Sequence, residues 1–122
     1  MLHSYMSTST RQEAMSKRSR ACDFSAKERT LIKDRDYRCI FCCRRYRMEK
    51  ANAFNTSIME IMHYIPRSQG GLGIARNAAL GCKYHHMMMD ESEHRAEMRG
   101  ILRDYLRSMY QDWNEADLIY HK

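Results

Sequence analysis

The chain has 122 residues, the size of one domain, and with 43% hydrophobic residues it can bury a modest core. Its net charge of +6 favours a polyanionic partner but specifies no chemistry. No apolar run approaches the roughly 18 residues of a membrane span, and the N-terminus lacks the apolar core of a signal peptide. We therefore expect a soluble, cytoplasmic protein with no membrane partner.

The first 21 residues contain a serine and threonine run and a basic cluster, Lys17, Arg18 and Arg20, without a periodic apolar pattern. This composition predicts a disordered basic arm over residues 1–21, followed by one domain over residues 22–122. Two interpretations of the arm stay open: a tail that contacts phosphate, and a terminus that is only solvated.

A helix is predicted to follow the arm. Ser25-Ala26-Lys27-Glu28 has the Ser-x-x-Glu pattern of a capping box, in which the serine and glutamate side chains each accept a free backbone N–H. Leu31 and Ile32 add the apolar spacing of a short helix, which should end near Asp36.

Two pairs of residues have the spacing of metal ligands. Cys39 and Cys42 form a Cys-x-x-Cys pair, and Cys82 and His85 form a Cys-x-x-His pair further along the chain. Two such turns can close a tetrahedral zinc site, and the odd total of five cysteines argues against a framework of disulfides alone. Unligated buried cysteines are the alternative, and Cys43 could replace Cys42 as a ligand.

A strand is predicted over residues 58–65, with His63 on one face and Met62 and Tyr64 on the other. A histidine in an apolar strand is by itself most often structural. The only proline of the chain and four of its five glycines lie between residues 66 and 81, which predicts a loop after this strand.

A helix is predicted from about Cys82 onward. His86 and Asp90 are four residues apart and lie on one face, whereas His85 points about 100° away from His86. The two histidines therefore cannot easily share a metal. We assign His85 to the zinc site, and His86 with Asp90 to a separate divalent ion.

A second, longer helix is predicted by an apolar stripe between residues 91 and 110. The stripe consists of Met98, Ile101, Leu102, Tyr105, Leu106 and Met109. It should face the core, although a homodimer through this C-terminal helix is an alternative. The apolar residues Trp113, Leu118, Ile119 and Tyr120 should then fold back onto the domain.

Taken together, these motifs resemble the HNH endonuclease superfamily. His63, Asn77 and His86 match the His, Asn and His of its signature, and Ile65-Pro66-Arg67-Ser68-Gln69-Gly70-Gly71 resembles the segment after its catalytic histidine. The chain is most similar to small phage and prophage HNH proteins, over roughly residues 18–122. The resemblance implies an α+β fold with a ββα-metal (His-Me finger) core and an accessory zinc site. It also implies an N-terminal helix, a long C-terminal helix, and a bacterial or phage-infected host cell.

The resemblance further implies metal-dependent hydrolysis of phosphodiester bonds in DNA. His63 would be the general base, and Asn77 would brace the loop that orients it. His86 and Asp90 would hold magnesium or manganese, because a carboxylate suits a hard cation. The zinc would be structural.

The chain departs from the superfamily at Met62. The residue before the catalytic histidine is usually an aspartate or histidine that ligates the metal, and a thioether is a poor ligand for magnesium. This departure favours an alternative function, a catalytically weakened, zinc-stabilised module that binds DNA or protein. Arg67 and Lys83 are expected to hold phosphate, with plain surface charge as the alternative interpretation.

Overall fold

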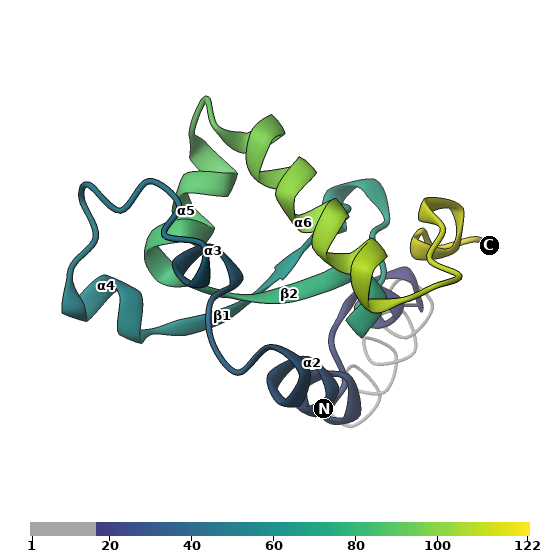
Figure 1. Ribbon diagram of the computed structural model, residues 1–122. Helices are drawn as coiled ribbons and strands as arrows, with labels where there is room; N and C mark the ends of the chain where they lie inside the picture. The colour runs from purple at the N-terminus through teal and green to yellow at the C-terminus, as the bar shows by residue number, and fades with distance from the viewer. Residues whose placement is uncertain (1–16) are drawn as a thin grey trace, which may run out of the picture.

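The structure is a computed structural model that describes residues 17–122, and a two-stranded antiparallel sheet lies at its centre (Figure 1). Strand β1 (Met59–His63) pairs with β2 (Ala78–Cys82), so that Met59 lies opposite Cys82 and His63 opposite Ala78. The helices are α2 (Ala26–Asp36), α3 (Ile40–Cys43), α4 (Ala53–Ser57), α5 (Lys83–Glu91) and α6 (Arg95–Met109). Short 3₁₀ turns occur at Arg67–Gln69, Ala75–Asn77 and Glu115–Leu118. The predicted mixture of helices with a small antiparallel hairpin is confirmed, and the assignment of this core to the HNH superfamily stays a prediction.

Helices cover both faces of the hairpin, and Figure 1 shows α2 on one side of the sheet and α6 on the other. Ile61 packs with Ile32 of α2 in the smaller apolar cluster. Met62 packs on the opposite face, in the larger cluster that contains Met98 and Leu102 of α6. Strand β2 is therefore buried along its whole length. Among residues 17–122, no helix is both long and apolar enough to cross a membrane.

The close packing of the two strands depends on Gly81. A Cβ atom at this position would lie 2.3 Å from Sδ of Met62, closer than non-bonded atoms can approach. Met62 is completely buried and fills the space that Gly81 leaves. Its side chain thus belongs to the core.

Helix α2 begins and ends where the sequence predicts. Oγ of Ser25 accepts the backbone N–H of Glu28 at 3.2 Å, and the helix ends at Asp36. The second half of the predicted capping box is wrong, because the Glu28 carboxylate accepts the backbone N–H of Ala75 at 2.8 Å instead. That contact ties α2 to the segment that enters β2.

The predicted arm, residues 1–21, is only partly within the described range. Residues 17–22 are helical, so the expectation of disorder is wrong for its last five residues. The reason is tertiary: the backbone N–H of Gly73 donates to the carbonyl of Ala21 at 2.9 Å, and Cys22 is buried. Residues 1–16 of the arm lie outside the described residues.

The C-terminal half follows the predicted stripe with one interruption. The predicted helix over residues 91–110 begins later, at Arg95, because Ser92 ends α5 through a side-chain hydrogen bond to the carbonyl of Met88 at 2.5 Å. Met98, Leu102 and Leu106 are completely buried within the chain, whereas Met109, the last member of the predicted stripe, is exposed. A homodimer through this helix stays a prediction.

The C-terminal segment folds back onto the glycine-rich loop, as predicted. Leu118 is completely buried, and its carbonyl accepts the backbone N–H of Leu72 at 2.8 Å. The backbone N–H of Tyr120 donates to the carbonyl of Gly70 at 2.8 Å. This end of the chain therefore fixes the loop that follows β1.

An ion pair that the sequence did not reveal joins α2, β2 and α6. The guanidinium of Arg35 contacts both carboxylate oxygens of Asp36, at 2.6 and 3.0 Å, and the Asp36 side chain is completely buried. Arg35 also donates to the carbonyls of Ala75 and Ala78, at 2.8 and 2.6 Å. Asp36 accepts the backbone N–H of Leu80 at 2.8 Å. Burial lowers the pKa of the Arg35 guanidinium. The hydrogen bonds and charge interactions with Asp36 and Tyr110 raise it by more, so the pKa stays above its usual value.

Replacing Arg35 with methionine should destabilise the protein strongly. The change leaves the Asp36 carboxylate buried without its partner, which typically costs about 3–5 kcal/mol. The free energy of unfolding in urea measures the effect. The matched control is Arg103→Met, which removes the exposed pair of Arg103 with Asp104 and should cost about 1 kcal/mol or less. Equal losses in the two variants would contradict a special role for the buried pair.

Candidate functional site

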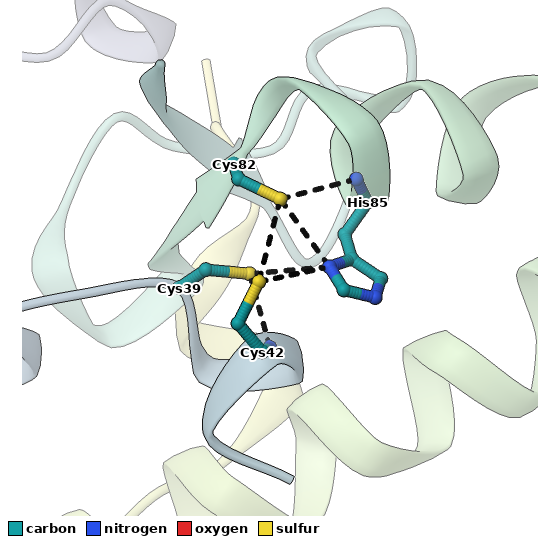
Figure 2. A group of neighbouring side chains, drawn as sticks. All are labelled: Cys39, Cys42, Cys82 and His85. Carbon is teal, nitrogen blue, oxygen red and sulfur yellow. Dashed lines mark hydrogen bonds between the residues drawn. The ribbon is translucent and has the colours of Figure 1, made fainter. Parts of the chain in front are cut away.

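Four predicted metal ligands lie together. Sγ of Cys39 and Sγ of Cys42 are each 3.5 Å from Nδ1 of His85, and Sγ of Cys82 is 3.3 Å from it (Figure 2). The sulfur atoms of Cys42 and Cys82 are 3.7 Å apart. Among residues 17–122, this is the one set of three or more histidine, cysteine or acidic side chains that is close enough to share an ion.

Each pair of ligands is formed by a tight turn at the start of a helix. Cys39 caps α3, and its sulfur accepts the backbone N–H of Cys42 at 3.4 Å. Cys82 caps α5 in the same way, with its sulfur 3.4 Å from the backbone N of His85. These N–H groups partly balance negative charge on the two sulfurs.

The ring of His85 is oriented for ligation by Nδ1. Nε2 lies 2.7 Å from the carbonyl of Tyr46, which can only accept, so Nε2 carries the proton. The lone pair is then on Nδ1, which faces the three sulfurs. A backbone partner of this kind is typical of histidines that bind metal.

The spacing of the four atoms fits a tetrahedral ion. Zinc-to-sulfur bonds of about 2.3 Å and zinc-to-nitrogen bonds of about 2.0–2.1 Å imply ligand separations of roughly 3.5–3.8 Å. Burial, together with Cys39 and Cys82, raises the pKa of the Cys42 thiol, and a cation would reverse that effect. The cluster can therefore hold a metal ion, consistent with structural zinc. Cys43 is exposed and outside the cluster, so Cys42 is the ligand of this pair.

A pocket of about 400 Å³ brings together a second group of predicted residues. It lies between the end of β1, the loop after it, α5 and the start of α6. The charged or titratable side chains in its wall are His63, Tyr64, Arg67, His86, Asp90, Arg95 and Arg99.

His63 is held by the N-terminal segment. Its Nε2 lies 3.0 Å from the carbonyl of Cys22 and must donate to it, which leaves the lone pair on Nδ1. The ring of Phe24 packs against it with centroids 4.6 Å apart. Burial lowers the pKa of His63 below its usual value, and the positive charge of Arg67 adds to that effect. The imidazole is thus neutral at pH 7.

Asn77 is completely buried and joins the two sides of the loop. Its side-chain oxygen accepts the backbone N–H of Ile65 at 2.9 Å. Its amide nitrogen donates to the carbonyls of Ile65 and Leu72, at 3.1 and 2.9 Å. These contacts fix the chain where it leaves His63, so Asn77 acts on the loop and does not face the pocket.

His86 lies between two carboxylates. Nδ1 is 2.9 Å from Oε1 of Glu60, and Nε2 is 3.4 Å from Oδ2 of Asp90. Asp90 lines the pocket and Glu60 does not. Glu60 was missed in the sequence analysis. Strand alternation places it on the same face of β1 as Met62, and the fold brings that position to His86 of α5.

Of three further residues that the sequence singled out, two lie outside the pocket and one lines it. Met62 is in the core and absent from the pocket wall. Lys83 lies beside a separate, mainly apolar groove near Phe54, so it is distant from the phosphate site expected around His63. Arg67 does line the pocket, and it pairs with Asp23. The sequence could not show which arginines face the pocket, because the turn between α5 and α6 decides that.

Replacing Cys82 with serine should remove the bound metal and destabilise the fold, because three ligands and a neutral hydroxyl hold zinc poorly. The expected result is a fall from one zinc per chain to near zero, with a lower melting temperature. Metal content by mass spectrometry and thermal unfolding with and without chelator measure both. The control is Cys43→Ser, at the exposed neighbour of the cluster, which should keep full metal content.

Comparison of the chain with protein-family models, with curated proteins and with solved structures gives no match.

Proposed function

We propose that the chain is a metal-dependent HNH endonuclease that hydrolyses phosphodiester bonds in DNA. The observation that supports this most is the pocket shared by His63, His86 and Asp90, with arginines in the same wall. It combines a neutral imidazole, a site for a hard cation and positive charge for phosphate. These are the groups that phosphodiester hydrolysis requires.

His63 is the general base of the proposal. Its lone pair is on Nδ1, because Nε2 donates to the carbonyl of Cys22. A pKa lowered by burial keeps the ring neutral, so it can accept a proton from water at pH 7. Asn77 positions this base through the loop, and it does no chemistry itself.

The residues for a catalytic cation are His86 and Asp90, on adjacent turns of α5. Their 3.4 Å separation is near the roughly 3 Å expected between neighbouring ligands of an octahedral ion, and the exposed Asp90 carboxylate can adjust. Nδ1–H of His86 donates a hydrogen bond to Glu60, which leaves Nε2 as the ligand atom on the pocket side. Met62 contributes nothing here, so water and substrate phosphate would complete the coordination.

The proposed reaction begins when Nδ1 of His63 takes a proton from water. The resulting hydroxide attacks phosphorus in line, and the bond from phosphorus to the 3′ oxygen breaks, with the leaving oxygen protonated by solvent. Arg67 neutralises a phosphate oxygen. Magnesium or manganese on His86 and Asp90 would supply positive charge where charge builds up in the transition state. Zinc on Cys39, Cys42, Cys82 and His85 would be structural, because these four side chains would hold it without an open position for substrate.

Purified protein should nick or cut supercoiled plasmid with magnesium or manganese, and EDTA should stop the reaction. His63→Ala should lower the rate about 10²–10⁴-fold, the range for loss of a general base, while zinc content stays at one per chain. The control is His121→Ala, at an exposed histidine outside the pocket, which should cut like the wild type. If the wild type binds DNA but does not cut it with either magnesium or manganese, the chain is a zinc-stabilised DNA-binding module instead.

The rate of cleavage should also report the pKa of His63. Only the neutral imidazole accepts a proton, and burial lowers its pKa below the usual 6.5. The rate should therefore be constant near neutral pH and should fall only as the pH drops below about 6.5. Single-turnover cleavage between pH 4.5 and 8 measures this. A rate that rises steadily above pH 7 would argue against His63 as the base.

A further inference from the structure

Two arginines of α6 face the pocket without any motif to mark them. Arg95 and Arg99 are one helical turn apart and therefore lie on one face of α6. Both belong to the wall that also contains His63 and His86. Neither forms an ion pair with an acidic side chain of residues 17–122.

Each guanidinium is held in place but keeps donors free. Arg95 donates from Nε to the carbonyl of Met89 at 3.0 Å, and also donates to the carbonyl of Asp90. A guanidinium has five N–H groups, so three remain for a ligand. The guanidinium carbon of Arg99 lies 5.4 Å from the ring centroid of Tyr64, a buried residue, and this contact orients the side chain at little entropic cost.

The charge balance of the pocket favours an anion at this position. Its wall contains three arginines against one carboxylate, Asp90. Arg67 already has Asp23 as a partner, so the uncompensated positive charge comes from α6. A planar guanidinium with parallel N–H groups suits a phosphate oxygen pair better than it suits water.

We infer that Arg95 and Arg99 each bind a backbone phosphate of a nucleic acid on the α6 side of the pocket. The inference deepens the proposed nuclease function and rests on it. With Arg67 on the loop side, the substrate backbone is contacted from two elements and its phosphodiester lies beside His63. Lys83, which the sequence suggested for this role, takes no part.

The test measures binding apart from cleavage. Fluorescence anisotropy of a labelled duplex without added magnesium or manganese, between 50 and 200 mM salt, gives the slope of log affinity against log salt. Arg95→Gln and Arg99→Gln should each reduce the magnitude of this slope by about 1, and the double variant by about 2. The matched control is Arg107→Gln, an exposed arginine of the same helix outside the pocket, which should leave the slope unchanged.

Several results would overturn the inference. These are an unchanged slope in folded Arg99→Gln, an equal loss in Arg107→Gln, or no binding of the duplex by the wild type. Since Arg95 also binds the last carbonyls of α5, its variant is checked by thermal unfolding, and Arg99→Gln decides the matter if Arg95→Gln unfolds. If the slopes fall as expected but the wild type never cuts, the phosphate site stands and the nuclease proposal fails. If the wild type cuts and the slopes do not change, the nuclease proposal stands and this inference fails.

Discussion

A two-stranded hairpin is marginally stable in water by itself, so this fold depends on the contacts that hold β1 and β2 from outside. They act at three levels along the strands. The Cys and His cluster joins the start of α5 to α3 at one end. Arg35 and Asp36 hold the middle of β2 to α2, and Asn77 closes the other end of the hairpin. The Cys and His cluster, a buried ion pair and an amide thus share a task that a larger domain would give to its apolar core.

The pocket lies at the end of β1, and its parts come from distant stretches of sequence. His63 lies at the end of β1, its orienting carbonyl comes from residue 22, and His86 is on α5. The flanking arginines come from the loop and from α6. Because the pocket is assembled from separate elements, a small shift of α2 or α6 would change the geometry around His63 even if every pocket residue stayed the same.

The sequence predicted those features that depend on local spacing. The two ligand pairs, the Ser25 cap and the end of α2 follow from patterns of a few residues. The sequence did not predict the features that depend on tertiary packing. These are the helical residues 17–22, the Arg35–Asp36 pair, the position of Glu60 beside His86, and the position of the α6 arginines in the pocket wall. The Glu28 side chain shows the difference clearly. Its local partner was the backbone of Ser25, yet the folded chain offers Ala75 at 2.8 Å, and that contact wins.

Met62 illustrates how a departure from a motif can be compatible with the fold. The side chain is completely buried and packs against the Cα of Gly81, so a charged residue there would lose solvation without a partner. Position 62 in this chain is thus constrained by packing, and the neighbouring Glu60 is the acidic side chain of β1 that reaches α5.

The hydrogen bond from His63 to residue 22 is made to a main-chain carbonyl, so every amino acid at that position offers the same acceptor. Single substitutions at residue 22 therefore cannot remove this acceptor, and they do not measure how important the hydrogen bond is. What can disturb it is a change in the path of the backbone, such as a fusion or cleavage near residue 20. The orientation of His63 therefore depends on the path of the backbone around residue 22.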